Sequence, residues 1–337
     1  MGSQNGIEAD LVNRKGIDFT AIPAAGIHGV SFRVLPGNIF KMLRGFFASR
    51  QIIRKFNPDV LFFTGGFVAV PMALASGKRP KLVYSPDIEP GLALRLLARF
   101  TKTIAVTVKE TRKHFPGNKK VITTGYPVRN ELSKWHRDKA LKYFNLNSDS
   151  PILLFLGGSK GAHSINQVVV DSLSVLLRRF QIIHLSGSLD WQYIEKMISI
   201  MSPEQLKQYH AFPYLHDDIG AAYACADLVI SRSGASILGE YPFFGLPAIL
   251  IPYPHAWRYQ KVNADYLVDH HAAILLEDAK LADELIPTIN DLFDNPIKLS
   301  NMRLSMKSIA LPNATINIAR LISELSKPKI LETGGNQ

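Results

Sequence analysis

The chain is poor in cysteine and contains no long apolar run. Its single cysteine, Cys225, excludes an intramolecular disulfide and a cysteine-based metal cluster. It lies beside an apolar run in YACADLV, which predicts a small core residue in a protein from a reducing compartment. No stretch of about 18 apolar residues occurs and the start of the chain has no apolar signal core, so neither a membrane-spanning helix nor a secretory signal is expected.

Acidic residues are outnumbered by basic ones. The chain has 39 Lys and Arg against 28 Asp and Glu, a net charge of +11. This balance favours an anionic partner: a nucleic acid, a phospholipid surface or a phosphorylated substrate. Nucleic acid is not expected, because the basic residues are dispersed and no aromatic stacking motif accompanies them. No Asp-x-Asp pair stands at a strand end, so nothing in the sequence requires a metal or a cofactor.

Short apolar runs alternate with helical patterns along the 337 residues. Most of the runs are apolar on both faces, as in the strands of a parallel sheet covered by helices. Helical patterns such as 162–179 and 236–244 separate them, which predicts a doubly wound α/β fold. The expected strands are 60–63, 81–84, 103–106, 121–123, 152–156, 181–185, 227–230 and 248–251.

The length of the chain favours two domains. Residues 131–150 are polar, and a second series of strands begins just after them. The sequence therefore predicts a first domain over 1–148, a second over 149–328, and a tail over 329–337. Two such α/β domains are expected to form a cleft, with ligands bound beyond the carboxyl ends of the strands.

Glycine pairs follow two of the expected strands. Gly65 and Gly66 come after 60–63, and Gly157 and Gly158 come after 152–156, with Ser159 and Lys160 next. Glycines let the backbone approach a ligand closely, and the first turn of a following helix offers unpaired N–H groups suited to phosphate. Tight strand-to-helix turns also use glycine for steric reasons alone, and for each loop both interpretations stay open.

The stretch LVISRSGASILGEY changes abruptly from an apolar strand to small polar residues. Gly234, Ala235 and Ser236 would place free N–H groups at the start of a helix. Glu240 lies one turn after Ser236 and would project to the same side, where a carboxylate can accept hydrogen bonds from two ribose hydroxyls. The alternative is a surface acid that only complements the helix dipole.

A polar and aromatic segment, PYPHAWRYQKVN, follows the strand 248–251. His255, Arg258, Gln260 and Asn263 can each form hydrogen bonds to a ligand at that edge of the sheet. A lone histidine after a strand is more often structural than catalytic, so His255 is a candidate only.

Seven motifs, in order along residues 6–325, resemble the bacterial lipid-linked muramyl-pentapeptide N-acetylglucosaminyltransferases of glycosyltransferase family 28. They are TGGFVAVPMALA, EPGLALRLLARF, TTGYPVRNEL, FLGGSKGAHSIN, AAYACADLVISRSGASILGE, GLPAILIP and YQKVNADYL. The resemblance implies a GT-B architecture of two Rossmann-like domains. It implies inverting, metal-independent transfer of N-acetylglucosamine from UDP-GlcNAc to a polyprenyl-diphosphate-linked acceptor during peptidoglycan synthesis, by a peripheral protein on the cytoplasmic side of the plasma membrane.

The resemblance also implies which residues bind the donor. Ser159 and the helix after Gly158 would hold the diphosphate with Arg129, while Glu240 would bind the ribose and Gln260 the sugar. His216 would lie in the uracil-binding loop. The implied donor-binding set is Arg129, Gly158, Ser159, His216, Gly234, Ala235, Ser236, Ile237, Leu238, Gly239, Glu240, Gln260 and Asp87, with Gly65 and Gly66 on the acceptor side.

The sequence departs from the family pattern in two places. About one strand–loop–helix unit of roughly 30 residues is expected before GSQNGIEADLV, and the usual catalytic histidine would lie on it. The first domain is therefore expected to be incomplete and the catalytic base is unassigned. Asp87 replaces a sugar-contacting Asn and can only accept hydrogen bonds when ionised. A UDP-sugar transferase with another lipid acceptor, or a UDP-sugar-binding protein with impaired catalysis, are the alternatives.

A basic helical pattern over 38–56 carries Arg44 and Arg50 beside Phe46 and Phe47. Such a helix suits the interface of an anionic membrane. At least one of the two phenylalanines is expected to face outward. Ile39, Leu43 and Ile53 are expected to pack on the sheet instead.

Overall fold

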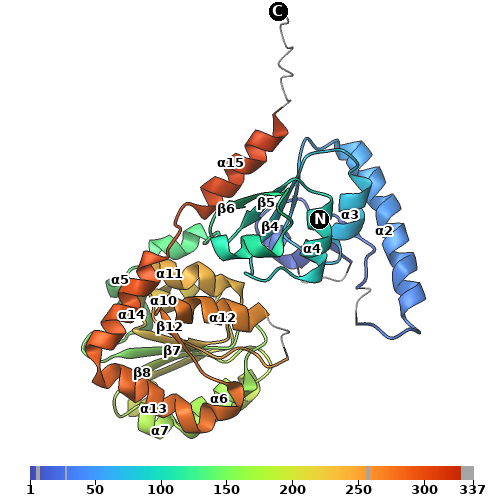
Figure 1. Cartoon of the computed structure of the whole chain (residues 1–337). Helices are drawn as coiled ribbons and strands as arrows, with labels where there is room; N and C mark the ends of the chain where they lie inside the picture. The colour runs from blue at the N-terminus through green and yellow to red at the C-terminus, as the bar shows by residue number, and fades with distance from the viewer. Residues whose placement is uncertain (5–7, 27–28, 256–258, 328–337) are drawn as a thin grey trace, which may run out of the picture. The chain divides into compact units, whose positions relative to one another are not determined.

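The structure is a computed structural model, and it describes residues 1–4, 8–26, 29–255 and 259–327. The chain forms two compact units (Figure 1). Unit 1 comprises the chain up to Thr124 together with the segment that starts at Thr315, and unit 2 comprises Gly125–Ala314. These limits differ from the predicted 148 and 328. The polar segment after Thr124 packs within unit 2, whereas the last helix returns to the sheet of unit 1.

Unit 1 contains a four-stranded parallel sheet in the order β3-β4-β5-β6, with a separate parallel pair, β1-β2. The strands are β1 (Gly2–Ser3), β2 (Ala21–Ile22), β3 (Leu61–Phe63), β4 (Lys81–Ser85), β5 (Thr103–Val106) and β6 (Lys120–Thr123). The helices are α1 (Glu8–Arg14), α2 (Leu35–Phe56), α3 (Ala69–Ala75), α4 (Leu92–Arg99), η1 (Lys109–His114) and α15 (Ala314–Ser326).

Helices cover both faces of the four-stranded sheet. On one face, Phe63 and Val83 pack with Ile53 of α2, Met72 of α3 and Leu97 of α4. On the other, Leu82, Tyr84 and Ala105 pack with Ile318 and Leu321 of α15. The side chains of the strands are apolar on both faces because each face is buried against a helix.

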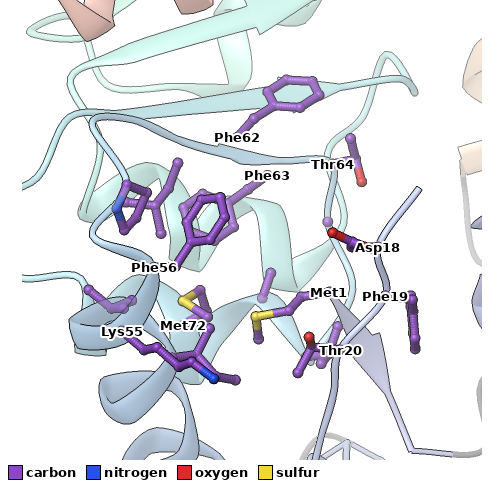
Figure 2. A pocket seen from close by; sticks show the side chains of 17 residues that line it. Met1, Asp18, Phe19, Thr20, Lys55, Phe56, Phe62, Phe63, Thr64 and Met72 are labelled. Atoms are coloured by element: carbon purple, nitrogen blue, oxygen red, sulfur yellow. The ribbon is translucent and has the colours of Figure 1, made fainter. Parts of the chain in front are cut away.

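A cavity of about 850 Å³ lies in unit 1 beside β3 (Figure 2). Phe62 and Phe63 of β3 border it, as do Met1 and Thr20 near the β1-β2 pair and Gly65 of the loop after β3. Among the described strands, β3 pairs only with β4, so its other edge is directed toward this cavity.

Unit 2 is built on a six-stranded parallel sheet in the order β12-β11-β10-β7-β8-β9. The strands are β7 (Ile152–Leu156), β8 (Gln181–Leu185), β9 (Tyr209–Phe212), β10 (Leu228–Ser231), β11 (Ala248–Leu250) and β12 (Ala273–Leu275). One core joins Leu153, Phe155 and Ile230 of the sheet to Ile165 of α6 and Leu285 of α13.

The helices of unit 2 fill the connections between its strands. They are η2 (Asn130–Lys134), α5 (Arg137–Phe144), α6 (His163–Asp171), α7 (Leu173–Leu176), α8 (Trp191–Ile198), α9 (Pro203–Leu206), α10 (Ile219–Cys225), η3 (Ala235–Leu238), α11 (Glu240–Phe244), α12 (Tyr259–Asp269), η4 (Asp278–Lys280), α13 (Leu281–Asp294) and α14 (Pro296–Ser308).

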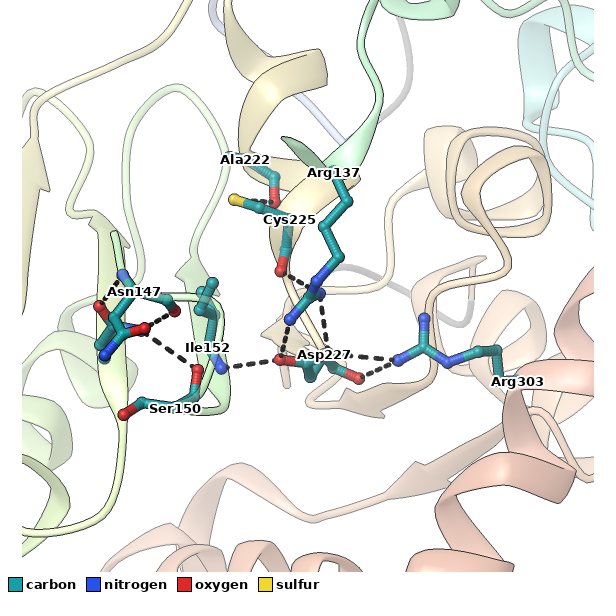
Figure 3. A network of polar contacts seen from close by, with 9 residues as sticks. Arg137, Asn147, Ser150, Ile152, Ala222, Cys225, Asp227 and Arg303 are labelled. Carbon is teal, nitrogen blue, oxygen red and sulfur yellow. Dashed lines mark hydrogen bonds and ion pairs between the residues drawn. The ribbon is translucent and has the colours of Figure 1, made fainter. Parts of the chain in front are cut away.

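Asp227, just before β10, joins four elements at the amino-terminal end of the sheet (Figure 3). Its carboxylate accepts hydrogen bonds from both terminal nitrogens of Arg137, at 2.9 and 3.1 Å, and from the Ile152 N–H at 2.9 Å. Arg303 of α14 donates to the Asp227 carbonyl at 3.2 Å. These contacts fasten α5 and α14 to β7 and β10, which explains why the segment after Thr124 belongs to unit 2.

Cys225 is buried and forms no disulfide, as the sequence predicted for a small core residue, and its thiol donates to the Ala222 carbonyl at 3.7 Å. Burial raises the pKa of its thiol to about 12. The protonated thiol is a poor nucleophile near neutral pH.

All eight predicted strands are present, with ends shifted by one residue at most. Four further strands, β1, β2, β9 and β12, were not predicted because they are short or lack a run of β-branched residues. The expected helix over 162–179 divides into α6 and α7, and the expected helix over 236–244 divides at Gly239 into η3 and α11.

The predictions for α2 were only partly right. Ile53 is buried and Phe47 is 67% exposed, as expected. Ile39 and Leu43 are 44% and 54% exposed, so their predicted packing on the sheet is wrong. The helix packs instead through Asn38, Gly45, Ser49 and Ile53. Gly45 lets α2 lie close to the backbone at Pro23, since a Cβ at Gly45 would be 2.2 Å from the Pro23 carbonyl oxygen.

Candidate functional site: a nucleotide pocket in unit 2

The order of the strands reverses between β7 and β10. The chain continues from β7 to β8 on one side, whereas β11 follows β10 on the other side. Leu156 and Ser231, the last residues of the two strands, are register partners. The loops that follow them therefore start side by side at a topological switch point, where open α/β sheets bind ligands.

The loop after β7 depends on two glycines for its shape. A Cβ at Gly157 would be 2.2 Å from the Ala162 nitrogen, and one at Gly161, with φ +91°, would be 2.2 Å from the Ser186 carbonyl oxygen. Gly158 has nothing within 4 Å of its Cβ position. The loop thus turns tightly at its ends and leaves Gly158, Ser159 and Lys160 exposed to a ligand.

A second loop, 186–188, supports this glycine loop. The Ser188 N–H donates to the Ser159 carbonyl at 3.3 Å. The buried Asn166 side chain donates to the Ser186 carbonyl at 2.8 Å and to Asp190 at 2.7 Å, and its oxygen lies 2.9 Å from His184 Nε2. Burial lowers the pKa of His184 to about 3, so this imidazole is a neutral part of the support.

The loop after β10 begins η3 with Gly234 as its N-cap residue, followed by Ala235 and Ser236. Ile237 and Leu238 are 1% and 6% exposed as whole residues, so they are packed inside unit 2 and present almost no surface to a ligand. A Cβ at Gly239 would be 2.6 Å from Tyr126 Cβ. Glycine is therefore required for this turn to pack against the segment before η2.

Glu240 opens α11 and is 8% exposed. The Tyr223 hydroxyl of α10 donates to its Oε2 at 3.0 Å, and Arg129 Nη2 lies 3.9 Å from its Oε1. Arg129 Nη1 also donates to the His216 carbonyl at 3.3 Å. Three residues predicted from separate parts of the sequence, Arg129, His216 and Glu240, are thus brought together.

The environment of Glu240 changes its acidity. Burial raises the pKa of its carboxyl above the usual value, and hydrogen bonds from Tyr223 and Ser236, with the Arg129 charge, oppose this rise. Burial also raises the pKa of Tyr223 well above its usual value. The Tyr223 hydroxyl therefore stays protonated and donates a hydrogen bond to Glu240. A shielded carboxylate beside a cation is suited to binding hydroxyl groups of a ligand that also carries negative charge.

Arg232 lies in the same loop and was not assigned a role from the sequence. Its guanidinium pairs with Asp278 of η4, donates to the Ser164 hydroxyl at 2.9 Å and donates to the Ile251 carbonyl at 3.2 Å. It therefore ties the loop after β10 to the start of α6 and to the end of β11. The detectable signal was an arginine directly after a buried strand.

The segment after β11 contributes Gln260 and Asn263 to the same end of the sheet. Gln260 Oε1 accepts a hydrogen bond from the Tyr253 N–H at 2.8 Å, which leaves its amide nitrogen for other partners. Asn263 is buried and donates to the Ser233 carbonyl at 3.3 Å, so its role is structural. His255 is exposed and packs edge-on against Tyr253, and Arg258 lies outside the described residues.

Asp87, Gly65 and Gly66 belong to unit 1, after strands β4 and β3. The Ser85 hydroxyl donates to the Asp87 carbonyl at 3.0 Å. Gly65 and Gly66 have φ of +114° and +79°, backbone conformations that favour glycine.

The described part of the chain shows neither a metal-binding cluster nor a helix able to span a membrane. Over residues 1–4, 8–26, 29–255 and 259–327, no group of three or more His, Cys, Asp or Glu is arranged to hold a metal ion. Among the described helices, none has both the length and the apolar character needed to cross a bilayer.

Comparison with known proteins decides the family. The glycosyltransferase family 28 N-terminal domain matches residues 1–106, and the family 28 C-terminal domain matches residues 152–315. The UDP-N-acetylglucosamine–N-acetylmuramyl-(pentapeptide) pyrophosphoryl-undecaprenol N-acetylglucosamine transferase of Roseiflexus sp. strain RS-1 is 37% identical, over 96% of this chain and 83% of that protein. The transferase of the same name from Desulforamulus reducens is 36% identical, over 96% and 89%.

The chain belongs to glycosyltransferase family 28.

Solved structures agree with this membership. The crystal structure of Acinetobacter baumannii MurG is similar to this family 28 chain with a TM-score of 0.73 and 25% identity, covering 96% of this chain and 89% of that one. The two parallel α/β units are those of the predicted GT-B architecture. A UDP-GlcNAc 2-epimerase from Neisseria meningitidis, with 14% identity and a TM-score of 0.67, shares the fold alone.

Proposed function

We propose that this family 28 glycosyltransferase moves N-acetylglucosamine from UDP-GlcNAc to a polyprenyl-diphosphate-linked muramyl-pentapeptide. The names of its relatives in Roseiflexus and Desulforamulus support the donor and acceptor. The observation within the chain that carries the proposal is the cluster of Glu240, Arg129 and His216 beside the switch point of unit 2.

The donor would lie across the two loops at the switch point. The exposed backbone at Gly158 and Ser159 and the N–H groups of Ala235 and Ser236 supply donors for the diphosphate, and Arg129 supplies positive charge. Glu240 would accept hydrogen bonds from the ribose hydroxyls. The backbone near His216 would contact the uracil, and the amide nitrogen of Gln260 the sugar.

The chemistry needs a base at the acceptor hydroxyl and stabilisation of the departing UDP. The acceptor oxygen attacks the anomeric carbon, its proton goes to the base, and the bond from that carbon to the diphosphate breaks with inversion. The loops described above would stabilise the charge that develops on UDP. The base is not assigned to a residue of this chain.

Isothermal titration calorimetry with UDP and UDP-GlcNAc tests the pocket. Glu240→Ala should weaken UDP binding by about tenfold or more, because a charge-assisted hydrogen bond is lost. The matched control is Asp283→Ala, an exposed acid in the first turn of α13. Unchanged UDP affinity in Glu240→Ala would overturn the pocket.

Transfer of N-acetylglucosamine to an analogue of the polyprenyl-diphosphate-linked muramyl-pentapeptide tests the reaction. A second acceptor or sugar is favoured by one observation, the acid at Asp87 where the family pattern has an amide. A competing assay with UDP-GalNAc and UDP-glucose tests the sugar: preference for UDP-GlcNAc supports the first proposal, and equal or greater use of another donor supports a different sugar. Binding of UDP without transfer would indicate a donor-binding protein.

Helix α2 supports a peripheral site of action on the cytoplasmic leaflet. Its exposed Ile39, Leu43 and Phe47 stand among exposed Arg44 and Arg50. Apolar side chains within a basic helix suit the interface of an anionic membrane, where the polyprenyl acceptor would be held.

A further inference from the structure

Tyr223 lies beneath the proposed ribose-binding carboxylate and does not face the ligand itself. It projects from α10 and is 5% exposed. Its ring packs against Tyr241 and Phe244, with centroids 5.6 and 5.7 Å away. Its hydroxyl is 3.0 Å from Glu240 Oε2. The aromatic packing fixes the ring, so the hydroxyl is presented to the carboxylate at one place.

The two oxygens of Glu240 have different surroundings. Oε2 receives the buried Tyr223 hydroxyl, whereas Oε1 is near Arg129, whose side chain is 41% exposed. The oxygen bound to Tyr223 is therefore on the protein side, and the other is on the more open side. Because a carboxylate is planar, a hydrogen bond to Oε2 also sets the direction in which Oε1 presents its lone pairs.

We infer that Tyr223 is a positioning residue, which holds Glu240 so that Oε1 accepts hydrogen bonds from the ribose of the donor nucleotide. The inference rests on the proposed function, in which Glu240 binds the ribose. It adds a specificity element behind the pocket: the preference for a ribose with free hydroxyls depends on a tyrosine that never touches the nucleotide.

The neighbouring Tyr241 offers a matched comparison. It is 1% exposed, belongs to the same aromatic cluster, and donates its hydroxyl to Ser231 Oγ at 2.7 Å. Removal of either hydroxyl takes one hydrogen bond from a buried tyrosine. Of the two tyrosine hydroxyls, that of Tyr223 is bonded to Glu240 and that of Tyr241 to Ser231, so the two substitutions separate positioning of the carboxylate from general stability.

The experiment compares the dissociation constants of UDP and 2′,3′-dideoxy-UDP by calorimetry. In the unchanged protein, UDP should bind at least about tenfold more tightly than the dideoxy compound, since hydrogen bonds to a carboxylate are strong. Tyr223→Phe should reduce this ratio to about threefold or less while binding of the dideoxy compound stays nearly constant. Tyr241→Phe should leave the ratio unchanged. A ratio in Tyr223→Phe equal to that of the unchanged protein overturns the inference.

Glu240→Gln gives a second test that leaves Tyr223 intact. The buried Tyr223 hydroxyl hydrogen needs an acceptor, so it takes the amide oxygen and directs the amide nitrogen to the ribose side. The amide nitrogen can donate to a ribose oxygen but cannot accept from a ribose hydroxyl, so the ratio of the two dissociation constants should fall below that of the unchanged protein. A ratio equal to that of the unchanged protein would mean that the amide oxygen turns to the ribose, and that outcome also overturns the positioning by Tyr223.

The inference and the proposed function fail in different ways. Loss of the ratio in Glu240→Ala, with no change in Tyr223→Phe, would overturn the role of Tyr223 and leave the pocket in place. An unchanged ratio in Glu240→Ala would overturn the ribose assignment itself.

Discussion

The two units both consist of parallel strands covered by helices, but they differ in the continuity of their sheets and in the side chains that they expose. In unit 2 the six strands form one sheet, and buried polar contacts fix the loops at its switch point. In unit 1 the strands form two separate sheets beside a cavity, and α2 exposes apolar side chains. The proposed function places the nucleotide in unit 2 and the larger, partly apolar acceptor in unit 1, and this comparison can be tested.

The largest expected effect is a loss of stability on substitution of Asp227, which lies at the end of the unit 2 sheet away from the pocket. Asp227→Ala leaves Arg137 and the Ile152 N–H without their carboxylate, whose side chain is 19% exposed. The free energy of unfolding of unit 2 should fall by about 2–4 kcal/mol, measured by urea denaturation.

Its matched control is Asp294→Ala, which removes the exposed ion pair with Arg179. That change should cost no more than about 1 kcal/mol. Similar losses for the two variants would contradict the idea that buried polar contacts distinguish unit 2.

The next effect concerns the glycine loop. Gly161→Ala adds a Cβ at φ +91° and 2.2 Å from the Ser186 carbonyl oxygen, whereas Gly158→Ala adds one at φ +86° into open space. Both substitutions strain the backbone, but only the first must displace the supporting loop. UDP binding should weaken in Gly161→Ala by about 2 kcal/mol, and by about 1 kcal/mol or less in Gly158→Ala. Calorimetry with UDP measures both, and a reversed order would contradict the role of this support.

A smaller effect is expected in unit 1. Phe47 is 67% exposed and Phe46 is partly buried, although the two are adjacent. Phe47→Ser should weaken sedimentation with vesicles of anionic phospholipid by about 1–2 kcal/mol, because an aromatic ring no longer enters the interface.

Phe47→Ser should leave UDP affinity unchanged, because Phe47 belongs to unit 1 and the proposed UDP pocket to unit 2. Unchanged vesicle binding in both Phe46→Ser and Phe47→Ser would contradict the membrane role of α2.

The smallest effect is a dependence on pH. Burial raises the pKa of Glu240, and only the ionised carboxylate has both oxygens unprotonated, so that Oε2 can accept from Tyr223 while Oε1 accepts from the ribose. UDP affinity should therefore be constant well above that raised pKa and should fall as the pH decreases through it. Calorimetry with UDP at a series of decreasing pH values should show a loss of affinity beyond the loss that the titration of UDP itself causes.

The nucleotide phosphate titrates in the same range, so Glu240→Gln is the reference. The pH dependence that remains in that variant belongs to UDP. An identical dependence in both proteins would show that Glu240 does not titrate in this window.

The sequence motifs predicted loops of glycine and small polar residues after two buried strands, a pattern that suits a phosphate site and a tight turn alike. Gly157, Ser236 and Glu240 were singled out as candidates in this way. Tyr223 and Arg232 were not, since a tyrosine in a helix and an arginine after a strand are common in sequences that bind nothing. The packing face of α2 was also misjudged, because Gly45 and Ser49 carry no hydrophobic signal although they form the buried side.

The sequence alone therefore determined the α/β class, eight of the strands and the positions of the glycine-rich loops, because these follow from short-range patterns of apolar and small residues, and the resemblance of its motifs indicated the family. The tertiary structure decided which of those residues meet. The parallel pairing of β7 with β10 placed two distant loops side by side, and the packing of α10 under α11 placed a tyrosine hydroxyl against Glu240. Such contacts depend on how helices and strands far apart in the chain pack together, which local sequence patterns do not encode.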